Sequence, residues 1–165
     1  MAEAQDRFRD IILAFLREAG IPVREMRLDD PFLPGLDIRD GTIVVDWTRL
    51  PHVGDLLHEA GHLAVTAPAR RNAPKLDPTP GDEMAAIAWS YAASVHLGVP
   101  IEVLFHPAGY KGGSDALIAA YREPNPGGGF YLGTPLLSAY GMTIEPRRAR
   151  PGGPPPYPHM LRWLR

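Results

Sequence analysis

Apolar residues near the start of the chain recur every three or four positions, with charged residues between them. They are Ala4, Phe8, Ile11, Ile12, Phe15, Leu16 and Ala19. This spacing puts them on one face of an amphipathic helix, which Gly20 and Pro22 are expected to end. The helix is predicted to serve packing.

A two-residue period replaces the helical one over residues 36–46. Apolar and polar side chains alternate up to Asp40-Gly41, and the run 42–47 that follows is apolar and β-branched. Asp and Gly both tolerate the positive φ that a type I′ turn requires, so the pattern predicts a β-hairpin. Residues 23–28 are a weaker strand candidate.

Two more helices are predicted after the hairpin. The first spans about residues 53–65, and the second runs from about 80 to 97. Thr79 is placed to cap the second helix, Pro80 to occupy its first position, and Asp82 to bond back to the cap. The second helix is apolar on nearly every side, which indicates that it is buried.

The last third of the chain carries weaker signals. Residues 114–121 are expected to form a short helix capped by Ser114, and 127–129 to form a turn. A further short helix is expected over 134–141. The Arg- and Pro-rich segment that starts at 147 is predicted to be extended and to dock on the body or on a partner, in preference to binding nucleic acid.

Composition fits a soluble globular protein. The chain has 165 residues, 45% of them hydrophobic and 22% charged, so we predict one domain over 1–146 followed by a tail over 147–165. Glycine (17) and proline (19) are abundant, which predicts a fold rich in loops. The formal net charge of −2 creates no overall field that would attract nucleic acid or an anionic membrane.

The sequence lacks cysteine and any predicted targeting or membrane-spanning segment. The chain has no cysteine, which excludes disulfides, Cys-ligated zinc, iron–sulfur clusters and thiol catalysis. Its first residues are too charged for a signal peptide, and no apolar run is long enough to span a membrane. We therefore expect a cytoplasmic protein.

One motif carries chemistry. His58-Glu59-Ala60-Gly61-His62 matches the pattern H-E-x-x-H. Residues four apart on a helix differ by about 40° in direction, so both imidazoles project from one face and can bind one tetrahedral Zn²⁺. Glu59 can flank the metal and accept the proton of a zinc-activated water. Gly61 weakens a helix interior, so its presence predicts the close approach of another backbone. The alternative is an amphipathic helix whose two histidines face solvent or a polar partner.

A catalytic zinc takes three protein ligands, and without cysteine the third must be His, Glu or Asp. Glu83 is the best candidate, because it lies in the first turn of an otherwise apolar helix, where the helix dipole favours a carboxylate. His96 points about 140° away from it on the same helix and is not expected to reach the metal. His106 and Asp82 are the alternatives.

Two supporting roles have several candidates each. A ligating imidazole donates its other N–H to a carboxylate or carbonyl, and the candidates for this are Asp55, Asp46 and Asp82. A donor across the metal from the base must stabilise the oxyanion, and the candidates for this are Tyr110, Tyr91 and His106.

Residues 57–62, the interval of twenty residues that follows, and residues 83–89 resemble the gluzincin arrangement of H-E-x-x-H plus a downstream helical Glu. The short chain, the strand before the motif and the pattern after Glu83 look most like the ImmA/IrrE group of small metallopeptidases. The resemblance covers about 42–93. It implies that His58, His62 and Glu83 hold Zn²⁺ and that Glu59 is the general base.

The expected fold is therefore α+β, with a zincin-like core in which a small, mainly antiparallel sheet packs on the motif helix and on the Glu83 helix. The expected activity is zinc-dependent hydrolysis of a peptide or protein substrate, with no membrane partner. If the strand at 42–47 is an edge, it could align an extended peptide. The alternatives are a non-catalytic zinc-binding regulatory or interaction module, and a structural domain with an accidental motif.

Overall fold

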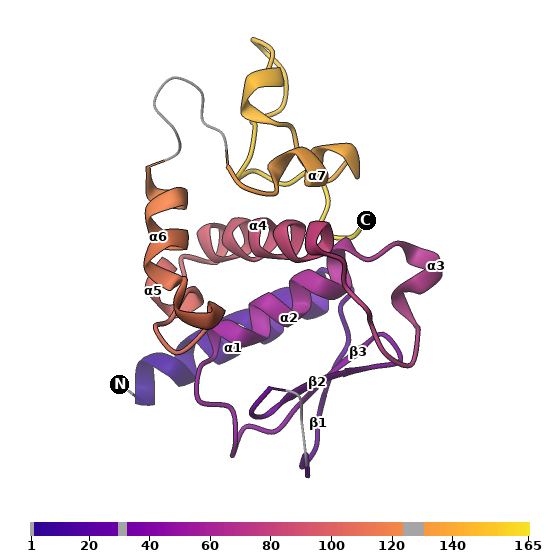
Figure 1. Cartoon of the computed structure of the whole chain (residues 1–165), viewed down its shortest axis with the longest axis vertical. Helices are drawn as coiled ribbons and strands as arrows, with labels where there is room; N and C mark the ends of the chain where they lie inside the picture. Colours follow the sequence, from indigo (N-terminus) through magenta and orange to yellow (C-terminus); the bar gives the residue numbers. More distant parts are fainter. Residues whose placement is uncertain (1, 30–32, 124–130) are drawn as a thin grey trace.

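The computed structural model describes residues 2–29, 33–123 and 131–165. Within them the fold is α+β, with a small sheet at one end of a group of helices (Figure 1). The strands are β1 (Val23–Glu25), β2 (Leu36–Arg39) and β3 (Thr42–Val45). The α-helices are α1 (Ala2–Glu18), α2 (Gly54–Val65), α3 (Pro68–Arg71), α4 (Pro80–Leu97), α5 (Ile101–Leu104), α6 (Ser114–Arg122) and α7 (Thr134–Ala139), with 3-10 turns η1 (Tyr110–Gly112) and η2 (Pro146–Arg148). None of these helices is long and apolar enough to cross a bilayer.

The predicted hairpin forms, and its turn has the predicted geometry. β2 pairs antiparallel with β3, and Asp40 and Gly41 at the turn have φ of 49° and 73°. Both angles are positive, as a type I′ turn requires. The weaker strand candidate also forms, as the short strand β1.

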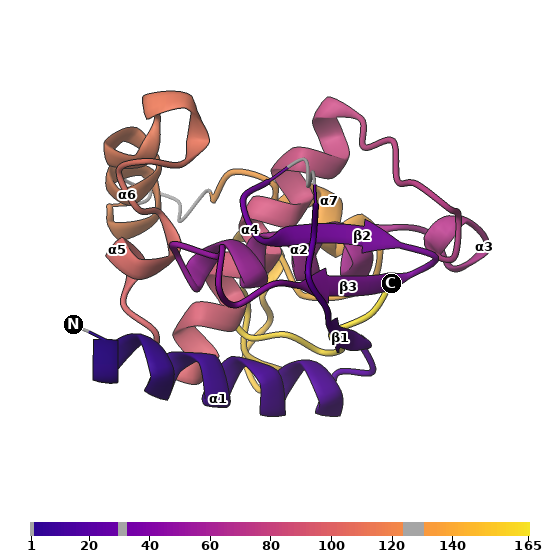
Figure 2. The same ribbon diagram turned by 90° about the horizontal axis from the view of Figure 1, so that it is seen from below.

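The sheet corrects two expectations. It is mixed instead of mainly antiparallel, because β1 pairs parallel with β3 (Figure 2). The strand order is β1-β3-β2, so β3 is the central strand and not an edge that could align a peptide. The reason lies in its composition, since Ile43, Val44 and Val45 have no exposed surface, and only a central position buries such a run on both faces.

Helices α2 and α4 pack against each other along much of their length (Figure 1). At Gly61 a Cβ atom would lie 2.7 Å from the carbonyl oxygen of Ala86 on α4. The glycine therefore permits the close backbone approach that its position in the sequence predicts. α1 packs against both α2 and α4, and its Ile12 and Leu16 are fully buried in the core that the three helices share.

Helix α4 begins as predicted. The Thr79 hydroxyl accepts the N–H of Asp82 at 3.2 Å, and the Asp82 carboxylate accepts the N–H of Thr79 at 3.0 Å. Pro80 occupies the first turn, and Gly98 ends the helix with a φ of 66°. This double cap fixes the turn that carries Glu83.

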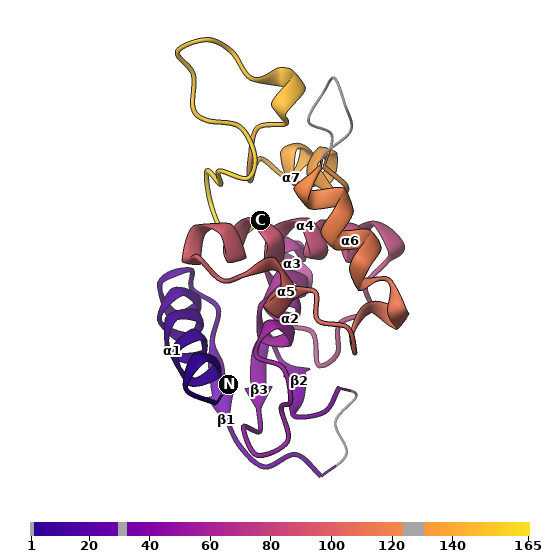
Figure 3. The ribbon, with the colours of Figure 1, turned by 90° about the vertical axis from the view of Figure 1, so that its left-hand side faces the viewer.

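The last third of the chain forms only some of the elements that the sequence predicts. α6 and α7 form, but Ser114 does not cap α6; its hydroxyl instead donates to the carbonyl of His106 at 2.6 Å. The expected turn at 127–129 lies outside the described residues. The tail returns to the body beside α4 (Figure 3). There the Tyr157 hydroxyl donates to the carbonyl of Ala88 at 2.9 Å.

Candidate metal centre

The motif histidines lie side by side on α2. The Nε2 atoms of His58 and His62 are 3.2 Å apart, and the two rings meet edge to face. His62 is buried, and His58 is half-buried. The helical period thus brings both nitrogens to one point, as predicted.

Glu83 completes the group from α4. Its Oε1 lies 3.3 Å from Nε2 of His58, and its Oε2 lies 3.2 Å from Nε2 of His62. Among the described residues, this is the one group of three potential metal ligands whose donor atoms gather within 4.8 Å of one another. His106 and Asp82, the alternatives for the third position, do not belong to it.

The donor set fits a metal ion of zinc's size and preference. For bond lengths of about 2.0–2.1 Å in a tetrahedral site, neighbouring ligand atoms lie about 3.3 Å apart. The Nε2 atoms of His58 and His62 are separated by 3.2 Å, close to this value, and Glu83 places a different carboxylate oxygen 3.2 to 3.3 Å from each of them. Two imidazoles and one carboxylate are a ligand set that leaves a fourth position open in catalytic zinc sites. The residues could therefore hold Zn²⁺.

Charges around the group favour a cation. Hydrogen bonds to His58 and His62 hold the pKa of Glu83 far below its usual range, although burial opposes this. Burial disfavours the charged form of His62, but the hydrogen bond to Glu83 and the carboxylates of Glu59, Glu83 and Asp82 outweigh it and raise its pKa. Several negative groups thus face the two imidazoles.

Glu59 lies beside the ligands without joining them. Burial raises the pKa of its carboxyl above the usual 4.5, and the nearby His62 and His58 only partly oppose this shift. A carboxylate in such a setting binds a proton more readily than one in water, which suits a general base.

Tyr110 is the oxyanion candidate that the structure brings to the group. Its ring meets the ring of His58 edge to face with centroids 5.3 Å apart. Its hydroxyl is buried and has no hydrogen-bond partner among the described residues. Burial, followed by the acidic groups Asp55, Glu83 and Glu59, raises the pKa of the phenol strongly, so it stays a proton donor at neutral pH.

The other two oxyanion candidates lie elsewhere. Tyr91 belongs to an aromatic cluster with Tyr121 and Tyr131. His106 has its Nε2 2.8 Å from the Asp55 carboxylate, and its ring stacks on His52 at 3.7 Å between centroids. His96 also lies away from the group, against Phe15 and Trp163, as its position on the helix predicts.

Within the described part of the chain, no carboxylate accepts a hydrogen bond from the Nδ1 side of either imidazole. Asp55 is engaged by His106, Asp46 by Thr48 and Leu28, and Asp82 by the cap of α4. The Nδ1 atoms of His58 and His62 are buried and have no partner among the described residues. None of the three candidates, Asp55, Asp46 and Asp82, therefore fills this role in the structure.

Sequence analysis missed the pairing of Asp55 with His106. The two residues lie 51 positions apart, and nothing in either local pattern links them. The pair supports the segment 106–110, because the His106 carbonyl accepts both the Gly109 N–H at 3.0 Å and the Ser114 hydroxyl at 2.6 Å. Tyr110, which meets His58, is the last residue of this segment.

Comparisons with protein-family models, with curated proteins and with solved structures find no match for this chain.

Proposed function

We propose that this protein is a zinc-dependent peptidase with a zincin-like centre. The observation that carries the proposal is the spacing of 3.2 to 3.3 Å among the donor atoms of His58, His62 and Glu83. The resemblance of residues 42–93 to the ImmA/IrrE group of metallopeptidases supports the same proposal.

His58, His62 and Glu83 would hold the metal. Bound Zn²⁺ supplies a Lewis acid that polarises a carbonyl and makes water acidic near neutral pH. The buried histidine nitrogens and the Glu83 carboxylate supply the electron pairs and the negative charge that such an ion requires.

The remaining steps belong to the chain. Glu59 accepts a proton from the attacking water as the C–O bond forms, and then gives that proton to the amine as the C–N bond breaks. Tyr110 donates its hydroxyl proton in a hydrogen bond to the oxygen that becomes negative in the tetrahedral state. The phenol is suited to this role because its buried hydroxyl has no other partner among the described residues.

A pair of substitutions tests the proposal. Glu59→Gln keeps the size of the side chain and removes the base, so zinc content should stay at about one ion per chain while hydrolysis falls by roughly 10²–10⁴-fold. His58→Ala should lose zinc and hydrolysis together. Zinc is measured by elemental analysis, and cleavage by mass spectrometry of a mixed peptide library.

The two variants also separate the alternatives. Zinc without any cleavage by the unmutated protein, or equal cleavage by Glu59→Gln, would favour a non-catalytic metal-binding module. Absence of zinc, even after it is added, would leave a structural domain with an accidental motif.

A further inference from the structure

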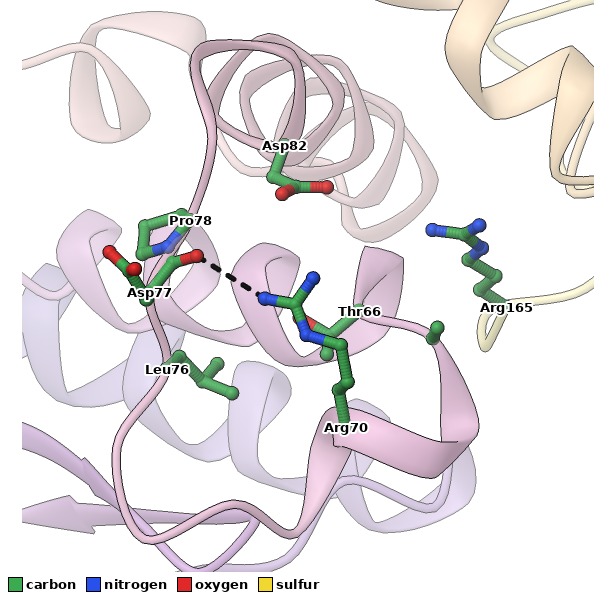
Figure 4. A pocket seen from close by; sticks show the side chains of 8 residues that line it. Thr66, Arg70, Leu76, Asp77, Pro78, Asp82 and Arg165 are labelled. Atoms are coloured by element: carbon green, nitrogen blue, oxygen red, sulfur yellow. Dashed lines mark hydrogen bonds between the residues drawn. The ribbon is translucent and has the colours of Figure 1, made fainter.

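A small polar pocket lies one helical turn beyond the candidate metal centre. Its volume is about 120 Å³, and it lies between the end of α2, the short helix α3 and the first turn of α4 (Figure 4). Thr66, Arg70, Asp82 and Arg165 are among its lining residues. One water molecule takes up about 30 Å³ in liquid water, so the pocket has room for one small charged group.

Two guanidinium groups line the pocket, that of Arg70 from α3 and that of Arg165 from the end of the tail (Figure 4). Arg70 Nη2 donates to the backbone carbonyl of Asp77 at 3.3 Å, and Arg165 Nη1 donates to the backbone carbonyl of Val65 at 3.3 Å. Both carbonyls are neutral, and so is the ring of Tyr140, whose centroid lies 3.6 Å from the Arg165 guanidinium carbon. Among the ion pairs of the described residues, none includes either arginine.

The acidic residues at the pocket offset these charges only in part, through Asp82, whose pKa both arginines help to lower. Asp77 turns its carboxylate away from Arg70, while its backbone carbonyl faces the guanidinium (Figure 4). Asp82 does face the pocket, but its Oδ2 already accepts the N–H and the hydroxyl of Thr79 at 3.0 and 2.8 Å. Two cations therefore meet a single carboxylate that the helix cap already uses.

The pocket lies at a useful distance from the metal ligands. Thr66 follows His62 by one turn of α2, which corresponds to about 6 Å along the helix, and its hydroxyl donates to the carbonyl of His62. Asp82 directly precedes Glu83. An extended peptide advances about 3.3 Å per residue, so a side chain roughly two residues from a bond at the metal could reach the pocket.

We propose that this pocket binds a carboxylate of the peptide substrate, held between Arg70 and Arg165. The protein would then prefer peptides with Asp or Glu about two residues from the cleaved bond. Planar guanidinium groups suit this ligand, because they can donate two parallel hydrogen bonds to one carboxylate. The role in substrate selection rests on the proposed function, whereas binding of the carboxylate does not.

Binding is tested without cleavage. Zinc-loaded Glu59→Gln protein is titrated with N-acetyl-glutamate amide and, separately, with N-acetyl-glutamine amide, while NMR follows the backbone amides of 64–82. The glutamate compound should bind at least tenfold more tightly and shift the amides of Thr66 and Arg70. Equal binding of the two compounds would overturn the proposal.

Matched variants locate the effect. Arg70→Gln should abolish the preference, and Arg70→Lys should keep part of it. Arg24→Gln makes the same charge change on the exposed strand β1 and should leave the preference intact. Preference that survives Arg70→Gln would overturn the proposal. So would inorganic phosphate that displaces the glutamate compound at equal concentration, since this would indicate an unselective anion site.

A peptide library then links the pocket to substrate choice. Unmutated protein should cleave sequences enriched in Asp and Glu near the cleaved bond, and Arg70→Gln should lose that enrichment at an unchanged zinc content. Cleavage without enrichment would overturn the role in selection. Selective binding without any cleavage would instead overturn the proposed function and leave the carboxylate site standing.

Discussion

At the scale of single residues, Gly61 shows how a missing side chain can bring potential metal ligands together. A Cβ at this position would lie 2.7 Å from the carbonyl oxygen and 3.2 Å from the Cα of Ala86. Both atoms belong to the backbone of α4, which cannot rotate away as a flexible side chain could. An added methyl group would therefore push α4 from α2, and Glu83 from the two histidines.

Gly61→Ala is predicted to destabilise the protein, although alanine favours a free helix by about 1 kcal/mol. Overpacking of this kind costs about 1–3 kcal/mol, and zinc affinity should fall as well. Urea unfolding and a zinc titration measure the two effects. Gly81→Ala is the matched control, because its Cβ would meet no atom closer than 3.7 Å. It should stabilise the protein by about 0.4–1 kcal/mol. Similar changes in both variants would argue against the close approach.

Tyr110→Phe is predicted to separate chemistry from binding. The variant removes one oxyanion donor, so kcat should fall by roughly 10²–10³-fold while zinc content stays the same. Stability should not fall, since the hydroxyl has no hydrogen-bond partner among the described residues. Tyr91→Phe provides the control, because its hydroxyl lies away from the three ligands and donates to the carbonyl of Tyr121 at 3.4 Å. Undiminished hydrolysis by Tyr110→Phe would remove the phenol from the mechanism.

At the scale of elements, Asp46 joins the end of β3 to the segment that follows β1. Its carboxylate accepts the Thr48 hydroxyl at 2.6 Å and the Leu28 N–H at 3.1 Å. These two bonds, with the Thr48 N–H and the charge of Arg49, lower the pKa of Asp46 below its usual 3.8, and burial opposes them only in part. The folded protein therefore favours the ionised form of this group more than the unfolded chain does.

The sign of the resulting pH dependence follows from linkage. A carboxyl with a lowered folded-state pKa stabilises the protein above the unfolded value near 3.8, and this stabilisation is lost as the pH falls through the folded value. Asp46→Asn should therefore lower the urea midpoint at pH 7, and the difference from the unmutated protein should shrink at pH 3. The exposed substitution Asp6→Asn should have little effect at pH 7. A difference for Asp46→Asn that is constant with pH would contradict the assignment.

Local signals in the sequence account for the elements that were predicted correctly. The caps at Thr79 and Gly98 and the turn at Asp40-Gly41 act within a few residues, so the sequence around each of them is enough to predict it. Helical spacing likewise brings His58 to His62. The approach of Glu83 to these two histidines depends on how α2 packs against α4. The interval of twenty residues between the motif and Glu83 predicts this approach only through the resemblance to gluzincins.

Contacts between distant segments account for what the sequence did not predict. β1 joins β3 in parallel through pairing of Val23 with Ile43, and no periodicity marks such a pairing. The hydroxyl of Ser114 could cap α6 or donate to a backbone carbonyl elsewhere. It donates to the carbonyl of His106, because the fold places that carbonyl within reach. Strand pairings and side-chain hydrogen bonds of this kind depend on tertiary packing, which a short stretch of sequence does not reveal.

At the scale of the whole molecule, the candidate metal centre joins two core helices, so zinc bound there should stabilise the entire fold. An ion at a thousand times its Kd adds about 4 kcal/mol. EDTA should accordingly lower the Tm of the unmutated protein by several degrees and leave that of His58→Ala unchanged. His96→Ala, altered at a histidine outside the centre, should respond to EDTA like the unmutated protein.

The zinc effect should also depend on pH. Metal binding requires neutral imidazole, and the pKa of His62 in the absence of metal is raised above 6.5. Protons therefore compete with zinc below this pKa, and the Tm difference caused by EDTA should shrink as the pH is lowered toward 5. A Tm that EDTA leaves unchanged at pH 8 would contradict zinc binding.

The returning tail bears on the order in which the chain folds. The indole N–H of Trp89 donates to the carbonyl of Trp163, which lies 74 residues later, at 3.0 Å. Arg165 donates to the carbonyl of Val65 across 100 positions. Closing such long loops costs entropy that early, local contacts avoid, so these bonds are expected to form last. During synthesis α2 and α4 can therefore bring His58, His62 and Glu83 together while the Trp89 indole still faces water.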